Sequence, residues 1–546
     1  MNSKIIAIIA VVIIAAAGVG GAVVLMGGNS GSTSSTASHD FTSYHGAASY
    51  AGKTVTVFGN ADGDQDFDLD DVNIVTKLAE LQVTLDEKNA ALSTAKKGTD
   101  QAAIDSAQTA YDDAKKALSD YEKEKNVKYY DTAKQYKGTT KSLSLADANC
   151  DGKYNSLDVA LVSQIVEIQG KINTQYPDGI TESVTLDKLK TDCDVEPITV
   201  FYYDVDSVMT QIKYPLTGDM AIGYKSNYEA VMICKAQARC AYACNQVSDS
   251  SSSYYSWYHE DFKDAQGIGS RFTPDYEVFL KSGNTAPQFF LTGTRAWFDE
   301  NMETTLAPQN VTVLRLPFWE DNVCLSSVAT LGFLIGCQVS TNEYVDIAAG
   351  VLEKIEAFVK DIDYKDRPFV FQSYNASSIS TMHNGIHEMV YAAGGCTPWD
   401  YGYSNGSIDA EAVMNMNADW IGLDQYFGFL ETYDTDAEKT FAKIITQLKD
   451  TNLKYIQAIN HTQAYKDGKV VFFNQGTYMG PASYVTIAYL FNKIYADHAG
   501  FVAFDVDALF SEYLAKYHPS LTIDEFVYDG VNMQYYDLAD YKKVAA

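Results

Sequence analysis

The sequence predicts an α/β fold for the C-terminal part of the chain, preceded by a mostly helical module and an N-terminal transmembrane helix. Three observations lead to this prediction. From about Pro197 onward, short apolar strands alternate with helices, the signature of layered α/β structure. Before that, two acidic loops are each followed by an apolar helix. The chain also carries an unbroken apolar run near its start.

Composition limits the classes of function. A chain of 546 residues is too long for one core, so we expect two or three domains. Its 46% hydrophobic and 21% charged residues are typical of a globular protein. The formal net charge of −30 argues against nucleic-acid binding, because neutralising phosphates requires a broad basic face. Such acidity suits a solvated exterior or bound cations.

Residues 1–28 are predicted to be a membrane anchor. Ile5–Met26 is uninterrupted apolar sequence of about the length that spans a bilayer. Lys4 precedes it, and no convincing cleavage site or lipid-carrying Cys follows it. We therefore expect an uncleaved signal anchor in the cytoplasmic membrane, with the C-terminal bulk outside at the cell surface. The alternative is a cleaved secretory signal, which would also export the protein. Residues 29–50 are rich in Ser, Thr and Gly and are predicted to be a linker that lifts the folded part off the membrane.

The two acidic loops predict calcium sites. In an EF-type loop, oxygens at positions 1, 3, 5, 7, 9 and 12 surround the ion, the seventh from a backbone carbonyl. The second loop, "DANCDGKYNSLD", has Gly152 at the sharp turn, whereas the first, "NADGDQDFDLDD", has Gln65 there and Gly63 close by. An acidic surface turn that binds nothing is the alternative. The predicted ligands are Asn60, Asp62, Asp64, Asp66 (carbonyl), Asp68 and Asp71 in the first loop, and Asp147, Asn149, Asp151, Lys153 (carbonyl), Asn155 and Asp158 in the second.

The segment between the loops, about residues 76–125, predicts a helical hairpin. Leu78, Leu81, Leu85 and Leu92 recur at spacings of three, four and seven, and after "KKGTD" a second apolar series runs to Tyr121. This periodicity places one apolar seam on each helix, so the seams can face each other. An inert spacer is the favoured interpretation, and contact with a partner is the alternative.

The loops resemble dockerin repeats. Each has Asp at position 12 and a single following helix, in "VNIVTKLAEL" and "VALVSQIVEI". The resemblance covers roughly residues 54–170, in a predicted module of residues 51–175. It implies two structural Ca²⁺ sites, the second more firmly than the first, and a cohesin-like protein as a partner. The inserted hairpin departs from a compact dockerin, which puts cohesin recognition in doubt.

The C-terminal domain, residues 197–546, contains three strand–helix phrases, then a long amphipathic helix at 342–362, then a new strand in "RPFVFQSYN". This order, with "HEMVYAAGG" and "SIDAEAVMNMNADWIGLDQ" after it, resembles ABC-importer substrate-binding proteins of the iron–siderophore, haem and cobalamin class. The resemblance implies a bilobed fold: lobe one at about 197–341, a rigid inter-lobe helix at 342–362, and lobe two at about 363–546. An α/β domain of enzymatic type is the alternative. No G-x-S-x-G, Walker or G-x-G-x-x-G motif is present, so we expect no enzyme activity.

Ligand contacts are predicted in the loops at the carboxyl ends of the strands. Tyr and Trp rings there suit a macrocycle or catecholate. Arg295, one of only five arginines, is predicted to bind an anionic ligand group in a bidentate manner, with an intradomain ion pair as the alternative. His383, with His387, could ligate a metal or make ordinary polar contacts. The predicted residues are Tyr224, Lys225, Arg295, Trp297, Trp319, Tyr374, His383, Trp399, Tyr426 and Tyr478.

The resemblance also implies docking on a permease. In this family, one exposed Glu on each lobe meets Arg on the ABC transporter permease, and the matching phrases "PDYEVFLKSG" and "IDAEAVMNMNADWI" place this role on Glu277 and Glu411. A solvated helix face would explain either Glu alone. The predicted function is therefore extracellular capture of an iron complex or related metal chelate for an ABC importer. The alternative is a surface adhesion or scaffold protein that docks through the dockerin-like module.

Overall fold

The structure is a computed structural model. It describes residues 40–131, 142–244, 260–281, 283–373, 385–403, 410–424, 454–473 and 479–520. The apolar run Ile5–Met26 lies outside these ranges. Within them, no helix combines the length and the apolar character needed to cross a membrane.

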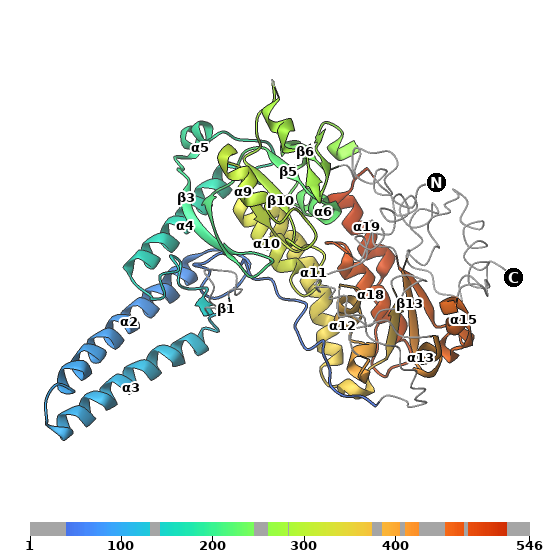
Figure 1. The fold of residues 1–546 in the computed structure, drawn as a ribbon, viewed down its shortest axis with the longest axis horizontal. Coiled ribbons are helices and arrows are strands. Elements are labelled where there is room, and N and C mark those ends of the chain that lie inside the picture. Colours follow the sequence, from blue (N-terminus) through green and yellow to red (C-terminus); the bar gives the residue numbers. More distant parts are fainter. Residues whose placement is uncertain are drawn as a thin grey trace, which may run out of the picture.

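Two acidic loops and a helical hairpin form the first part of the described chain. α2 (Leu69–Ala95) and α3 (Gln101–Glu124) pack on each other as the predicted hairpin, which projects away from the remaining structure (Figure 1). The turn falls at "KKGTD" as expected, and Asp100 caps α3 through the backbone N–H groups of Ala102 and Ala103. β1 (Tyr129–Asp131) pairs with β2 (Ser142–Ser144), and α4 (Ser156–Gln175) and α5 (Leu186–Cys193) follow.

Lobe one contains a five-stranded parallel sheet. Its order is β11-β10-β5-β6-β7, built from Thr312–Arg315, Phe289–Thr292, Met220–Ile222, Cys240–Ala243 and Gln266–Gly267. An antiparallel hairpin, β3 (Ile198–Tyr203) with β4 (Met209–Tyr214), precedes it, and β8 (Gly269–Ser270) pairs with β9 (Thr273–Pro274). The helices of this lobe are α6 (Lys225–Ile233), α9 (Met302–Leu306) and α10 (Cys324–Ile335).

One segment of lobe one contains a strand that its apolar pattern does not reveal. The apolar residues through "CKAQARCAYA" are compatible with a continuous helix, but α6 ends at Ile233 and residues 240–243 form the buried strand β6. Lys235 has a φ of 55°, a left-handed conformation that stops the helix. The strand was hidden because its apolar residues also fit a helical pattern.

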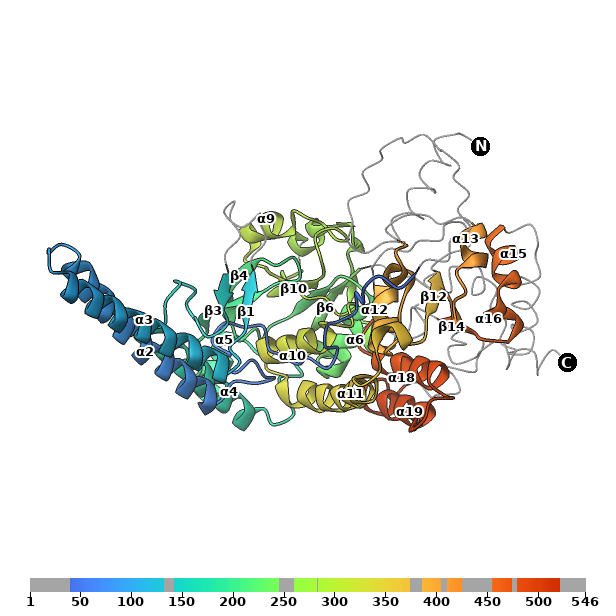
Figure 2. The same cartoon turned by 90° about the horizontal axis from the view of Figure 1, so that it is seen from below.

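A single long helix connects the two lobes. α11 (Gln338–Val359) begins four residues earlier than the predicted 342–362 and ends three earlier. Lobe two has a parallel sheet of β12 (Val370–Ser373), β13 (Trp420–Asp424) and β14 (Val470–Phe473). Its helices are α12 (Gly385–Ala392), α13 (Ala410–Asn415), α15 (Lys454–His461), α16 (Gln463–Lys466), α18 (Ser483–Ile494) and α19 (Val506–Tyr517). α18 packs on α11, and α19 contacts α6 of lobe one (Figure 2). The alternation of strands and helices around two separate parallel sheets confirms the predicted α/β class.

The loop module shares its core with lobe one. Phe67, in the first acidic loop, stacks on Phe333 of α10 with ring centroids 4.7 Å apart, and Tyr214 stacks on the same ring at 4.5 Å. One continuous cluster of buried residues includes Val55, Phe67 and Ile165 of the module and reaches Tyr517 of α19. The loop module and lobe one therefore share one hydrophobic core, and the module is not a separate domain.

Residues 40–58 form an extended segment, which we call the N-terminal strap. The Tyr44 ring stacks on Tyr364 at 4.1 Å, and the backbone N–H of His45 donates to Asp400 Oδ1 over 2.6 Å. The Tyr50 hydroxyl donates to Glu388 Oε2 over 2.7 Å in a buried position. Within the predicted linker, residues 41–50 are therefore held against lobe two and α11.

Candidate functional site

Two of the predicted ligand residues of lobe one, Tyr224 and Trp319, meet where three parallel strands end. Tyr224 follows β5 and Trp319 follows β11, with Phe298 beyond the end of β10 between them in the sheet order. The Tyr224 ring lies edge-on to Phe298 at 6.2 Å and to Trp319 at 6.3 Å, and Phe298 stacks on Trp319 at 5.9 Å. The structure thus brings together Tyr224 and Trp319, and it adds Phe298, which the sequence reasoning missed. We call these three rings the aromatic cluster.

A glycine makes room for the cluster. A Cβ atom placed on Gly293, directly after β10, would lie 2.0 Å from the Trp319 ring and 2.6 Å from Phe298. No side chain fits at that separation, so glycine is required for Trp319 to lie across the end of β10. The glycine in "TGTRAWFD" therefore serves ring packing.

A fourth group, Arg271, joins the cluster from the turn between β8 and β9. Its guanidinium carbon lies 4.0 Å from the Tyr224 ring centroid and 5.7 Å from that of Phe298, both distances typical of cation–π contacts. Sequence reasoning missed Arg271 because the two-residue strands that carry it have no recognisable periodicity. The one sequence signal that could have pointed to Arg271 was that arginine is rare in this chain.

Arg295 is engaged within lobe one, which corrects its predicted role in binding an anionic ligand group. Its Nη1 lies 3.1 Å from Asp204 Oδ2 and 2.7 Å from Asp206 Oδ2, and its Nη2 lies 2.7 Å from Glu303 Oε1. Buried Arg315 binds the same Glu303 through Nε at 2.6 Å. Burial alone would raise the pKa of Glu303, but the hydrogen bonds and charge of Arg315 hold that pKa below its usual value. The guanidinium of Arg295 is already surrounded by carboxylates, as the alternative interpretation held.

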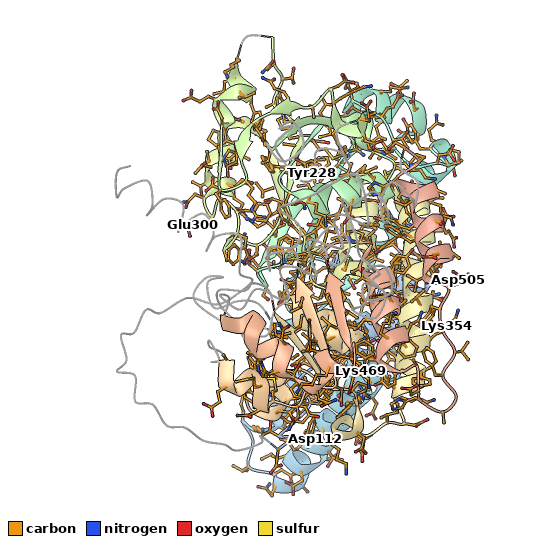
Figure 3. All side chains as sticks on the ribbon, turned by 90° about the vertical axis from the view of Figure 1, so that its right-hand side faces the viewer. Asp112, Tyr228, Glu300, Lys354, Lys469 and Asp505 are labelled. Atoms are coloured by element: carbon orange, nitrogen blue, oxygen red, sulfur yellow. The ribbon has the colours of Figure 1, made fainter. Side chains whose placement is uncertain are left out.

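The other predicted residues of lobe one and Trp399 have different surroundings. Lys225 is only 1% exposed, in the first turn of α6. Burial lowers its pKa, against the opposing charge of Glu229. Trp297 is half-buried beside Arg295, and Trp399 lies 5.4 Å from the His45 ring on the N-terminal strap. Figure 3 labels Tyr228 of α6 in lobe one and Lys469, which precedes β14, in lobe two. The predicted residues Tyr374, His383, Tyr426 and Tyr478 lie outside the described residues.

The two predicted docking carboxylates are both exposed. Glu277 lies in the short helix η2 (Tyr276–Leu280) of lobe one, and Glu411 lies in the first turn of α13 in lobe two. Their side chains therefore meet the first requirement for contact with another protein, and the docking role itself stays a prediction.

The first acidic loop folds around its own carboxylates. Asp71 Oδ1 accepts from the backbone N–H of Ala61 over 2.6 Å, and Asp64 Oδ1 accepts from that of Asp66 over 2.8 Å. Gly63 has a φ of 72°, so it takes part of the bend as expected. Burial, reinforced by Asp62, raises the pKa of Asp71 to about 8, and burial with Asp64 raises that of Asp62 to about 6. The carboxylates are crowded, which a bound cation would relieve.

The second loop repeats this arrangement. Asp147 Oδ2 accepts from Gly152 N–H over 2.7 Å, and Asp158 Oδ1 accepts from Asn149 N–H over 3.0 Å. Gly152 has a φ of 91°, as the sharp turn requires. The donor atoms of both loops are oxygens, the kind Ca²⁺ prefers. Within the described residues no three metal-ligating side chains converge into a ready site, so calcium stays a proposal.

The first loop also touches the inter-lobe helix. Gln65 Nε2 donates to Asp346 Oδ1 of α11 over 3.1 Å, and Gln338 Nε2 donates to the Gln65 carbonyl over 3.3 Å. Lys53 of the strap pairs with the same Asp346 at 3.1 Å. A cation in this loop would therefore stabilise the position of the N-terminal part of α11, the helix that joins the lobes.

Comparison with known proteins gives fold-level likenesses. No family model matches the sequence, and no curated protein matches it. Among solved structures, an ABC transporter solute binding protein from Sulfurospirillum deleyianum is 12% identical with a TM-score of 0.45, covering 60% of this chain and 98% of that one. The TroA-like periplasmic binding protein FepB from Veillonella parvula is 12% identical with a TM-score of 0.44, covering 58% and 95%. CeuE from Helicobacter pylori, with Ni(II) bound, is 13% identical with a TM-score of 0.42, covering 59% and 99%. Each TM-score is below 0.5, so the description of the fold depends on the topology given above.

Proposed function

We propose that this protein is the extracellular solute-binding component of an ABC importer and that it captures a metal chelate, either an iron siderophore, haem or cobalamin. The observation that carries the proposal is the aromatic cluster, Tyr224, Phe298 and Trp319, at the carboxyl ends of parallel strands in one of two α/β lobes. In open α/β sheets, ligands bind at that edge because loop backbone and helix N-termini converge there. Phe298 and Trp319 are 5% and 3% exposed and support the half-buried Tyr224, whose flat ring supplies apolar area that matches a macrocycle or aromatic chelator.

The connection between the lobes supports capture by a largely preformed site. α11 is a 22-residue helix whose buried face packs on α10, α12 and α18. Such a helix resists bending, so closure around a ligand is small and recognition depends on existing side chains. Binding is non-covalent in this proposal, and no reaction is catalysed.

The remaining parts have supporting roles in the same proposal. The apolar run Ile5–Met26 anchors the chain in the cytoplasmic membrane with the C-terminal bulk outside, and Glu277 and Glu411 meet the permease. The acidic loops hold structural Ca²⁺ through the twelve predicted positions. A cohesin-like partner would have to use the second loop or the projecting hairpin, since the first loop faces α10 and α11.

The test is a titration of the purified full-length chain with a ferric tris-catecholate, a ferric tris-hydroxamate, haemin and cyanocobalamin, followed by Trp fluorescence. We expect saturable quenching by one ligand class at micromolar or lower concentration. Trp319→Phe removes the reporter in the cluster and should abolish most of the signal, whereas Trp420→Phe, on β13, is the matched control. A folded chain that responds to none of the four ligands would refute capture of these chelates.

A further inference from the structure

The chain has one arginine at the aromatic cluster whose positive charge is not used elsewhere in the described structure. All five arginines are described. Arg295 and Arg315 bind carboxylates, Arg239 donates to backbone carbonyls such as Leu216 and Ile335, and Arg367 donates to the Val359 carbonyl. Arg271 makes ring contacts only, within the part of the chain that the structure describes. Unlike the other four arginines, the half-buried Arg271 therefore has no oxygen acceptor among the described residues.

The ring beneath Arg271 belongs to the residue that starts α6. Tyr224 is the N-cap of this nine-residue helix, and no side chain of the described residues caps it. The first backbone N–H groups of a helix carry partial positive charge, and in α6 that of Asn227 already donates to the Tyr224 carbonyl over 3.0 Å. Because the Arg271 guanidinium lies 4.0 Å from the Tyr224 ring centroid, two sources of positive potential stand side by side at the strand ends.

Two buried polar side chains in the same turn also lack partners among the described residues. Ser226 and Asn227 are both 0% exposed, and within the described part of the chain the Ser226 hydroxyl and both polar atoms of the Asn227 amide have no hydrogen-bond partner. Leaving such groups unsatisfied is costly, so native structures normally pair them with protein, water or ligand. A polar group of a bound ligand would complete this turn, because these atoms lie beside the start of the helix.

We propose that Arg271 and the first turn of α6 bind an anionic oxygen group of the captured chelate, either a carboxylate or a catecholate oxygen, while the half-buried Tyr224 ring of the aromatic cluster contacts its apolar part. This inference rests on the proposed function and narrows it to anionic ligands. It also replaces Arg295 with Arg271 as the anion-recognising arginine. A guanidinium and converging N–H groups suit an anionic oxygen because charge-assisted hydrogen bonds are stronger than neutral ones.

The test compares three ferric complexes on the full-length chain: an anionic tris-catecholate, an anionic citrate complex and a neutral tris-hydroxamate. Arg271→Gln should weaken binding of the preferred anionic complex roughly tenfold or more, while any binding of the neutral complex changes by about twofold or less. Arg271→Lys should fall between, because Lys keeps the charge but loses the planar fork. Preference between the two anionic complexes distinguishes catecholate from carboxylate.

The matched control is Arg367→Gln, which removes a second arginine that stacks on tyrosines, Tyr44 at 4.9 Å and Tyr364 at 4.4 Å, away from the cluster. It should leave all three affinities unchanged. Three results would overturn the inference and leave the proposed function intact. They are an equal loss of neutral and anionic binding in Arg271→Gln, no loss of binding in that variant, and a wild type that binds only the neutral complex. A folded wild type that binds none of the three, nor haemin or cyanocobalamin, would overturn the proposed function and this inference with it.

Discussion

The shared core of the loop module and lobe one makes a sharp prediction about stability. Phe333 of α10 is 1% exposed and stacks on Phe67 of the first acidic loop and on Tyr214 of β4. Phe333→Ala removes the ring from between these two partners. Truncating a buried Phe costs about 3–5 kcal/mol, through lost transfer free energy and the cavity that remains. We expect the upper part of this range, because two stacked pairs are lost together.

The assay is urea unfolding of the full-length chain, followed in parallel by Trp fluorescence and far-UV circular dichroism. The helical signal includes the α2–α3 hairpin, whereas Trp319 reports on lobe one. If the module and lobe one form one body, the variant lowers the midpoint of both signals together. Phe272→Ala, at a ring that is 37% exposed, is the matched control and should cost about 1 kcal/mol or less. A helical transition that separates from the fluorescence transition, or a Phe333→Ala cost below about 1 kcal/mol, would refute the shared core.

Three further predictions follow from the ion pairs, the acidic loops and the docking carboxylates. Glu303→Gln should destabilise the chain by about 1–3 kcal/mol at neutral pH, because Arg295 and Arg315 lose a shared counter-charge. The pKa of Glu303 is lowered in the folded state, so its carboxylate stabilises the fold fully above the ordinary Glu pKa of about 4.3. This stabilisation is lost as the pH falls through the lowered pKa. The difference in thermal midpoint between variant and wild type should therefore disappear over the same pH range. Saturating Ca²⁺ should raise the thermal midpoint relative to EDTA by an amount equivalent to about 2.7 kcal/mol at a hundredfold excess over Kd. Asp151→Asn should reduce that shift. An equal shift with Mg²⁺ would contradict calcium sites. Charge reversal at Glu277 and Glu411 should abolish uptake in cells while ligand titration stays unchanged, whereas unchanged uptake would favour the adhesion alternative.

Local sequence patterns predicted the elements that have strong periodicity or turn chemistry. The Leu spacing and the "KKGTD" break located the α2–α3 hairpin, and the glycines and carboxylates of the two loops predicted turns that the structure contains. Tyr224 and Trp319 were found because carboxyl ends of parallel strands share one edge of a sheet. In each case the decisive interactions are between residues close in sequence or fixed by a general topological rule.

Local sequence patterns do not predict contacts between residues that are far apart in the sequence. Arg295 binds Asp204 and Asp206, which lie about ninety residues earlier, and nothing local to "TGTRAWFD" indicates those partners. The N-terminal strap resembles a linker in composition, yet Tyr44 and Tyr50 find partners more than three hundred residues away. Arg271 lies in a turn whose strands are too short to leave a pattern, so only the folded arrangement reveals its position over Tyr224.

The route of the N-terminal strap sets how an N-terminal tether would orient the molecule. The strap meets the body at lobe two, where Thr42 donates to the Asp400 carbonyl, and only afterwards crosses α11 toward lobe one. The α2–α3 hairpin lies at the opposite end of the long axis (Figures 1 and 2). If Ile5–Met26 anchors the chain, pulling force therefore enters through lobe two, and the hairpin is the tip that reaches farthest from the attachment point. The α2–α3 hairpin would then extend into the surroundings and would not lie between the membrane and the lobes.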